Sequence, residues 1–271
     1  MVAEQHGCAR LRNFWFIAAL SFSMKTKSQK KRLDILLVER GLAESRQKAQ
    51  AMILAHEVSV NGAKAEKAGV SIAESARIEV TSRLQKYASR GGLKLEGALT
   101  DFAVNPANLV CLDLGSSTGG FTDCLLQHSA ARVYAVDVNV DQLAWKLQQD
   151  ARVVRVERNA RELKPEDVPE EVDLVVADVS FISVTKILAP AVRAAKPCAV
   201  FLILIKPQFE LRREDVGAGG IVKDASLHEK AIASVKRQAQ ANGLECLGVL
   251  PSRLTGAEGN QEFFLHARKI G

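Results

Sequence analysis

Short apolar runs recur through the second half of the chain, and small or charged residues follow each of them. Such uninterrupted runs are typical of parallel strands that are buried on both faces of a sheet. Segments with apolar residues at helical spacing separate the runs. This alternation predicts an α/β fold over residues 93–271, a doubly wound, mostly parallel sheet with one antiparallel strand. The expected strands cover 109–114, 132–137, 152–156, 172–178, 199–206, 247–250 and 262–267.

A second, smaller pattern covers residues 30–82 and predicts a small α+β module. Helical periodicity runs from Arg32 to Arg40 and again over 46–55, where Ser45 can cap the helix. Residues 58–63 read as a hairpin, because Asn61-Gly62 favours a tight turn between two short apolar strands. Residues 77–81 give a further strand, and residues 83–92 are expected to form the linker between the two domains.

The first 29 residues fit neither pattern. An apolar run over 14–22 follows Arg10 and Arg12 and weakly resembles a signal peptide. It is too short to cross a bilayer as a helix. Met24 opens a basic stretch that leads into the small module. We therefore expect Met24 to be the natural start and residues 1–29 to be a poorly ordered extension.

The composition shows a modest excess of basic residues and is otherwise that of an ordinary globular protein. The 271 residues are 47% hydrophobic and 25% charged, as in ordinary globular proteins, and the net charge is +6. From Met24 to Arg83 we count twelve Lys and Arg against seven Asp and Glu, so this stretch carries +5 of that charge. A polyanionic partner for the small module is the natural expectation.

Cysteine and histidine usage bears on metals and on compartment. The five cysteines form no C-x-x-C pair, and the five histidines have no ligand spacing. We therefore expect free thiols in a reducing compartment, the cytoplasm, and no metal site.

The turn after Leu114 is the first candidate for chemistry. A strand ending at Asp113-Leu114 leads through Gly115-Ser-Ser-Thr-Gly-Gly120 into a helix, which is how doubly wound folds hold nucleotides. The spacing differs from the Gly-x-Gly-x-x-Gly of diphosphate binders, and no P-loop Gly-Lys-Ser/Thr follows. A nucleoside ligand with little phosphate fits best.

The next strand ends in Asp137, a position at which a carboxylate accepts hydrogen bonds from ribose hydroxyls. Together the two features favour S-adenosylmethionine over NAD as the cofactor. Asn159, after the third strand, is expected near the adenine. The expected cofactor-binding residues are Asp113, Gly115, Ser116, Ser117, Gly119, Gly120, Phe121, Asp137, Val138, Asn159 and Asp178.

Four further charged residues are expected at the same edge of the sheet. Asp178 and Lys206 end parallel strands, while Glu262 begins a strand that reaches this edge if it is antiparallel. Lys94 lies on the helix that enters the domain. Seven apolar residues precede Lys206, so its amine should be partly desolvated, which favours the neutral form of a base.

The small module resembles the S4 RNA-binding domain. The resemblance rests on Arg32-Leu-Asp-x-x-Leu, Ser45-Arg-x-x-Ala and Val58-x-Val-Asn-Gly, which cover almost the whole module. It implies recognition of structured RNA by shape and backbone. The expected RNA-binding residues are Arg32, Arg46, Lys48 and Arg90.

From Arg32 to Ala267 the chain resembles the TlyA family, in which an S4 domain precedes a methyltransferase domain of the FtsJ class. The matching motifs are 89–95, 113–123, 177–183, 205–210 and 259–263. The resemblance implies S-adenosylmethionine-dependent 2′-O-methylation of cytidine in ribosomal RNA, 16S or 23S. It also implies a catalytic tetrad of Lys94, Asp178, Lys206 and Glu262. Asn139 and Asp141 stand where relatives usually have glycine.

Two other functions stay open at this point. One is a ribosomal-RNA-binding or ribosome-assembly protein without catalysis, which the two lost glycines would favour. The other is a hemolysin that acts on membranes, since the family is often labelled hemolysin A. No apolar run of 18 residues supports stable membrane insertion. In the methyltransferase reading, Lys206 is the general base that activates the ribose hydroxyl.

Overall fold

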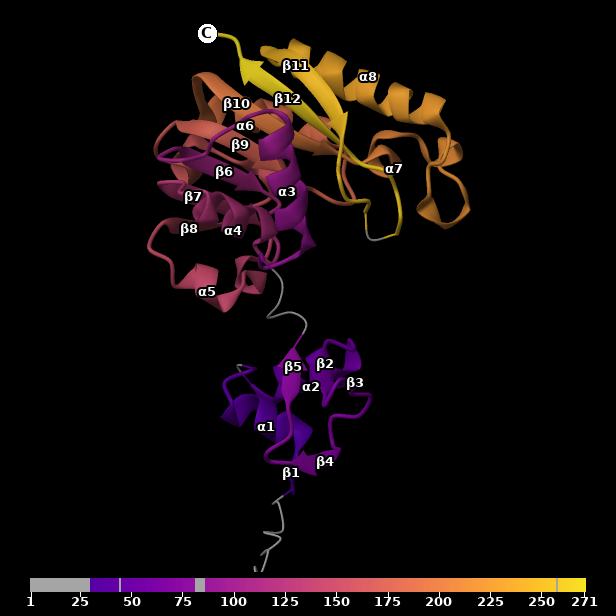
Figure 1. Cartoon of the computed structure of the whole chain (residues 1–271). Helices are drawn as coiled ribbons and strands as arrows, with labels where there is room; N and C mark the ends of the chain where they lie inside the picture. The colour runs from indigo at the N-terminus through magenta and orange to yellow at the C-terminus, as the bar shows by residue number, and fades with distance from the viewer. Residues whose placement is uncertain (1–29, 44, 81–85, 257) are drawn as a thin grey trace, which may run out of the picture. The chain divides into compact units, whose positions relative to one another are not determined.

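The computed structural model describes residues 30–43, 45–80, 86–256 and 258–271. The chain divides into two compact units, Met1–Thr81 and Ser82–Gly271 (Figure 1). The exact domain limits expected at residues 82 and 92 stay predictions. The expected extension at 1–29 lies outside the described residues.

The described residues of the first unit form two helices and two small sheets. Helices α1 (Leu33–Glu39) and α2 (Arg46–Leu54) match the expected helices. Ser45 caps α2, because its Oγ accepts a hydrogen bond from Lys48 N at 3.2 Å. Strands β3 (Ala63–Lys64), β2 (Val58–Val60) and β5 (Ile78–Val80) form one antiparallel sheet in that order. The pair β1 (Lys30–Arg32) and β4 (Ser71–Ala73) was not expected from the sequence.

The second unit is built on a seven-stranded sheet in the order β11-β12-β10-β9-β6-β7-β8 (Figure 1). Five neighbouring strands are parallel, and β12 is antiparallel to both β10 and β11, which confirms the mostly parallel fold. The strands are β6 (Val110–Leu114), β7 (Arg132–Asp137), β8 (Val153–Glu157), β9 (Val172–Ala177), β10 (Ala195–Ile205), β11 (Leu244–Pro251) and β12 (Phe263–Lys269).

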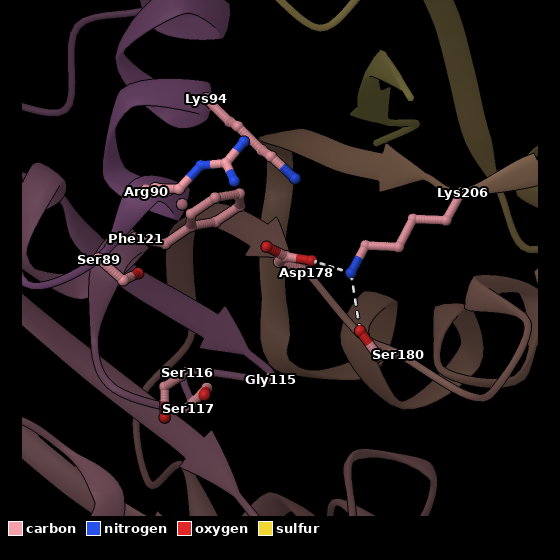
Figure 2. A pocket seen from close by; sticks show the side chains of 12 residues that line it. Ser89, Arg90, Lys94, Gly115, Ser116, Ser117, Phe121, Asp178, Ser180 and Lys206 are labelled. Atoms are coloured by element: carbon pink, nitrogen blue, oxygen red, sulfur yellow. Dashed lines mark hydrogen bonds and ion pairs between the residues drawn. The ribbon is translucent and has the colours of Figure 1, made fainter. Parts of the chain in front are cut away.

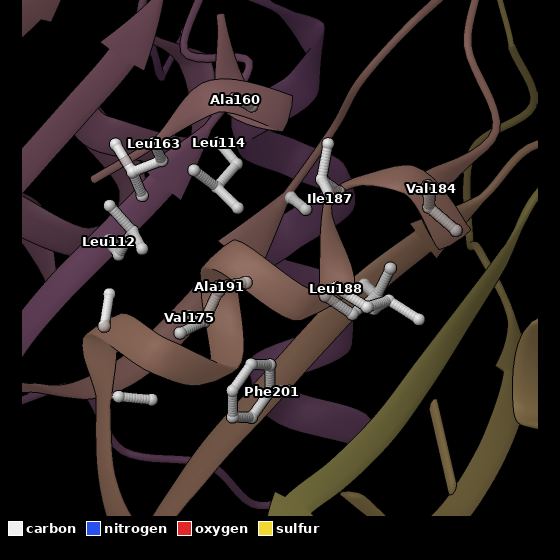
Figure 3. Close-up of a cluster of buried hydrophobic side chains, with 14 of the residues drawn as sticks. Leu112, Leu114, Ala160, Leu163, Val175, Val184, Ile187, Leu188, Ala191 and Phe201 are labelled. Atoms are coloured by element: carbon white, nitrogen blue, oxygen red, sulfur yellow. The ribbon is translucent and has the colours of Figure 1, made fainter. Parts of the chain in front are cut away.

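Helices cover both faces of this sheet, and each face has its own apolar cluster. On one face, α6 (Leu188–Ala194) and α8 (Ala225–Ala241) pack on the sheet. Figure 3 shows part of this cluster, with Leu188 and Ala191 of α6 near Val175 and Phe201 of the strands. The other face is covered by α3 (Arg90–Asp101), α4 (Gly120–Gln127) and α5 (Trp145–Gln148).

Burial on both faces explains the uninterrupted apolar runs in the sequence. Along β6, Cys111 belongs to the cluster under α3 and α4, whereas Leu112 and Leu114 belong to the opposite cluster. Successive side chains of a strand point to opposite faces, so every position of a doubly covered strand must be apolar or paired.

The chain enters the second unit through a packed segment. Tyr87 is buried, and a Cβ on Gly92 would lie only 2.4 Å from Tyr87 Cβ. Ala88 N donates to Asp123 Oδ2 of α4 at 2.7 Å. Since α3 begins at Arg90, the latter part of the expected linker, including Gly91 and Gly92, is held by this unit.

Candidate active site

The parallel strands β6 and β9 are neighbours in the sheet. After β6 the chain continues to β7 and β8 on one side, and after β9 it continues to β10 on the other side. Their carboxyl ends therefore border the crevice where doubly wound folds bind ligands. Gly115 follows β6 with φ +85°, and a Cβ there would lie 2.6 Å from the Asp178 carbonyl oxygen after β9. The turn can therefore take this course only with glycine at position 115.

Two cavities that share residues open at this edge. The first, of about 220 Å³, lies between the start of α3, the glycine turn and the end of β10 (Figure 2). The second, of about 420 Å³, lies towards the ends of β7 and β8. Both are lined by Gly115, Ser117, Asp178 and Ser180. The two cavities can therefore hold the two ends of one elongated ligand, or a ligand and its reaction partner.

The second cavity suits a nucleoside. Asp137 at the end of β7 accepts hydrogen bonds from Ser117 N at 3.0 Å and Asn139 N at 3.1 Å. These bonds fix the carboxylate, and each oxygen retains a lone pair for a ribose hydroxyl. Val138 and Asn159 also line this cavity, as expected for residues beside an adenine.

The first cavity offers an unsatisfied polar group beside the glycine turn. Ser116 is 4% exposed and its Oγ has no hydrogen-bond partner among the described residues. Buried hydroxyls are normally satisfied, so a polar ligand group is the expected partner. Ser116, Gly120 and Phe121 all line this cavity. The residues present therefore fit S-adenosylmethionine, with its nucleoside towards Asp137 and its amino acid end towards Ser116.

Two of the expected cofactor residues do not line either cavity. Asp113 is completely buried, and its Oδ2 accepts from Thr122 Oγ1 of α4 at 2.6 Å. Its position within β6, one residue before the strand end, turns it towards α4 rather than towards the crevice. Burial raises the pKa of Asp113 to about 7, and the nearby Asp178 and Asp137 charges act in the same direction. Gly119 packs with φ +91° against Leu147.

The four expected catalytic residues form two ion pairs. Lys206 Nζ lies 2.6 Å from Asp178 Oδ1, and Lys94 Nζ lies 2.5 Å from Glu262 Oε2. The side chains of both lysines are 10% exposed and that of Glu262 is 3% exposed. The antiparallel β12 brings Glu262 to this edge, because Phe263 pairs with Ile205 at the end of β10. Lys94, Asp178 and Lys206 line the first cavity.

Ser180 joins this group, although sequence reasoning did not single it out. Its Oγ accepts from Lys206 Nζ at 2.8 Å, and Figure 2 shows Lys206 reaching both Asp178 and Ser180. Lys206 Nζ therefore has two partners, a hydrogen bond to Ser180 and an ion pair with Asp178.

Further lining residues that were missed are Ser89, Gly91, Val136, Arg158, Ala160, Arg161, Val179, Phe181 and Ile182. Several of these residues belong to the motifs 89–95 and 177–183. Membership of these motifs was the feature of the sequence from which they could have been predicted.

The two lost glycines cause no backbone strain. Asn139 has φ −142°, and Asp141 is not among the described residues with positive φ. Asn139 Oδ1 instead accepts from Asp141 N at 3.2 Å and begins a short 3₁₀ turn over Val140–Gln142. The loop therefore keeps Asp137 in place without glycine.

The expected RNA-binding residues lie on the surface. Arg32 and Arg46 both contact Asp34, a carboxylate with no exposed side-chain area, at 2.9 Å. Arg32 above all holds the pKa of Asp34 well below its usual range. The two guanidinium side chains remain 43% and 55% exposed, and Lys48 is exposed. Arg90 lines the first cavity and donates to Thr255 O at 3.3 Å.

The described residues contain neither a candidate metal site nor a candidate membrane-spanning helix. No group of three or more His, Cys, Asp or Glu among them could hold a metal ion. In the same part of the chain, no helix has the length and apolar character needed to cross a membrane.

Comparison with known proteins agrees with this geometry. Residues 87–269 match the model of the FtsJ-like methyltransferases, and residues 31–78 match that of the S4 domain. The chain is 45% identical over 243 residues to the 16S/23S rRNA (cytidine-2′-O)-methyltransferase TlyA of Mycobacterium tuberculosis. That alignment covers 89% of this chain and 91% of the relative.

Two solved structures extend the comparison. One, described as a candidate hemolysin from Streptococcus thermophilus, is 38% identical, covers 90% of both chains and has a TM-score of 0.69. The other is described as a candidate S-adenosylmethionine-dependent methyltransferase from Listeria monocytogenes. It shares the fold at 14% identity, with a TM-score of 0.52, and covers 68% of this chain and all of that one. The chain therefore belongs to the FtsJ-like methyltransferase family, uses S-adenosylmethionine as methyl donor, and carries an S4 domain before the methyltransferase domain.

Proposed function

We propose that this protein methylates the 2′-hydroxyl of cytidine in ribosomal RNA, and that Lys206 is the general base. The observation that supports this best is the ion pair of Lys206 with Asp178 in a cavity that adjoins the nucleoside cavity. The identity to a named rRNA (cytidine-2′-O)-methyltransferase adds the substrate class.

The chemistry requires removal of a proton from a poor nucleophile. The bound cofactor supplies an activated methyl group on its sulfonium. Methyl transfer forms the ribose O–CH₃ bond and breaks the CH₃–S bond, while the hydroxyl proton passes to Lys206 Nζ. Lys206 must therefore begin the step as a neutral amine.

The neighbours of Lys206 orient this amine. Ser180 Oγ accepts one of its hydrogens, and Asp178 Oδ1 lies 2.6 Å from Nζ as an ion-pair partner. A neutral amine that keeps the bond to Ser180 and stays beside Asp178 can direct its lone pair towards the ribose hydroxyl, which is the orientation we propose. Attack on the methyl group is in-line, so such positioning supplies much of the rate.

The second ion pair has a supporting role in this proposal. Lys94 is held by Glu262 and lines the cavity wall formed by the start of α3. Its positive charge can bind the RNA phosphate or stabilise the developing oxyanion.

Targeting is assigned to the S4 domain. Arg32, Arg46 and Lys48 present cations on one module, and such modules contact the RNA backbone rather than base edges. The partner we propose is a ribosomal subunit or its RNA, and the site of action is the cytoplasm.

Mapping of ribose methylation in ribosomal RNA tests the proposal. Cells with and without the protein should differ at one or a few cytidines, and purified protein should restore the missing methyl groups on isolated subunits. Identical methylation maps would contradict the proposal.

The hemolysin name of one relative calls for a separate test. Dye release from liposomes should be absent for both the wild type and Lys206→Ala. Release that Lys206→Ala leaves unchanged would favour a direct action on membranes over methyl transfer.

A further inference from the structure

Two loops carry the groups that act on the ribose hydroxyl, and they leave adjacent parallel strands. The first loop follows β9 and contains Asp178 and Ser180, while the second follows β10 and begins at Lys206. The strands pair directly, with Ile203 beside Ala177. Backbone pairing ends there, so side chains must fix the distance between the two loops.

Side chains of three residues of the second loop contact the first loop. Lys206, nearest the strands, contacts Asp178 and Ser180. Next, the rings of Phe209 and Phe181 lie 5.5 Å apart. Farthest out, Glu210 Oε2 accepts from Ser183 Oγ at 2.5 Å.

Among these residues, Glu210 also binds a backbone group of the first loop. Its Oε1 accepts from Val184 N at 2.8 Å, so the carboxylate binds a side chain and the main chain of the other loop at once. Two such charge-assisted bonds fix a loop more firmly than a ring contact does. Burial raises the pKa of Glu210, in keeping with a carboxyl group enclosed between the loops.

The loop that Glu210 holds is strained. Phe181 has φ +65°, a left-handed conformation that is unfavourable for a residue with a side chain. Such a conformation persists only where neighbouring contacts enforce it. Ser183 and Val184 follow Phe181 by two and three residues, so their bonds to Glu210 close the strained turn. Glu210 itself follows Lys206 by four residues, at the end of α7 (Pro207–Glu210).

We propose that Glu210 is a positioning residue for methyl transfer, which holds the Asp178–Ser180 loop at the distance from Lys206 that the proton transfer requires. It does not touch the reacting atoms. The inference rests on the proposed role of Lys206 as the base. Its effect must therefore pass through Lys206, which distinguishes it from a residue that only stabilises the fold.

The test uses Glu210→Gln in the full chain. The amide keeps the shape but removes the negative charge and one of the two accepting oxygens, so the bond to Ser183 must reverse its direction and neither bond is charge-assisted any longer. Glu214→Gln is the matched control, because Glu214 is exposed in the next turn and pairs only at 3.5 Å with Arg212. Ser183→Ala, which removes one of the two bonds, is a second variant should Glu210→Gln fold poorly. Single-turnover methyl transfer to isolated ribosomal subunits is measured well below the melting temperature, together with cofactor affinity.

Glu210→Gln should lower the single-turnover rate by about 10–100-fold, the cost of small misplacement, with cofactor affinity changed less than about threefold. Ser183→Ala should act in the same direction, and Glu214→Gln should stay within about twofold of wild type. In a Lys206→Ala background, Glu210→Gln should change the residual rate by less than about twofold.

Two results would overturn the inference. One is a Glu210→Gln rate near that of wild type while Lys206→Ala is inactive, which would leave the proposed function intact. The other is an equal fold-loss in both backgrounds, which would assign Glu210 to folding alone. A Lys206→Ala protein of full activity would instead refute the proposed role of Lys206 as the general base, and this inference with it, while leaving the methylation itself intact.

Discussion

At the scale of single residues, three charged residues of the candidate site could be located from the sequence because they lie at the ends of buried strands. Asp137, Asp178 and Lys206 each follow an apolar run, and all three line the two cavities. Asp113 lines neither cavity and faces α4, which could be foreseen only if the strand periodicity were resolved to one residue. Ser180 and Glu210 were missed, since their partners are 26 and 27 residues away in the sequence.

The first residue-scale prediction concerns Asp137. Asp137→Ala should weaken S-adenosylmethionine binding by about 1–3 kcal/mol, through loss of charge-assisted hydrogen bonds to the ribose. Calorimetric titration measures the change, and Asp141→Ala, whose side chain is 91% exposed, is the control. Equal affinity of wild type and Asp137→Ala would remove Asp137 from the cofactor site.

A second residue-scale prediction concerns the buried Asp113. Its pKa of about 7 lies above the ordinary value of 3.8, so the folded state binds this proton more tightly than the unfolded chain does. The associated stability is present below about pH 4 and is lost as the pH rises through about 7, by at most about 4 kcal/mol.

In Asp113→Asn the side chain at position 113 does not titrate, so this variant should not lose stability in this way as the pH rises. Without cofactor, the unfolding free energy of the wild type should therefore fall relative to Asp113→Asn between pH 4 and pH 8. Denaturant titrations followed by Trp145 fluorescence, in a Trp15→Phe background, measure the difference. Parallel pH curves for the two proteins would show that Asp113 does not titrate in this range.

At the scale of elements, long helices and buried strands were predictable and very short strands were not. The runs over 109–114 and 132–137 became β6 and β7 almost residue for residue. Strands β1 and β4 have three residues each, and their pairing joins Lys30 to Ala73 across the module. A strand of three residues is too short to show an alternation of apolar and polar residues in the sequence, and its pairing depends on tertiary packing.

The close contact of α3 with α4 gives an element-scale prediction. A Cβ on Gly120 would lie 2.2 Å from Ser89 Oγ and 2.9 Å from Gly92 N, so Gly120→Ala must separate the two helices. We expect a loss of about 1–3 kcal/mol of stability and weaker cofactor binding. Gly248→Ala is the control, because its Cβ would meet Phe102 at an ordinary 3.5 Å. Equal melting temperatures for the two variants would contradict the close packing.

At the scale of the whole molecule, most of the net positive charge and the candidate active site lie in different parts of the chain. The stretch from Met24 to Arg83 carries five of the six net positive charges, and the four tetrad residues lie after it. The sequence alone indicated both domains, because their motifs do not overlap. The way in which the domains cooperate on RNA could not be predicted from either pattern.

Deletion of residues 1–84 tests this division. The remaining chain keeps Tyr87 and all the described residues of the second unit, so it should bind S-adenosylmethionine with unchanged affinity. Methylation of isolated ribosomal subunits should fall below detection, because the RNA-binding module is missing. If the truncated protein methylated subunits at the full rate, the first unit would not be the targeting domain.

The central claim is that Lys206 removes the proton from the ribose hydroxyl, and single-turnover kinetics of two variants tests it most directly. Lys206→Ala should lower the methyl-transfer rate by about 10²–10⁴-fold, with RNA and cofactor affinities nearly unchanged. Lys206→Arg should be almost as slow, because a guanidinium stays protonated and cannot accept the proton. An arginine variant within about threefold of wild type would contradict the general base and leave Lys206 a purely electrostatic role.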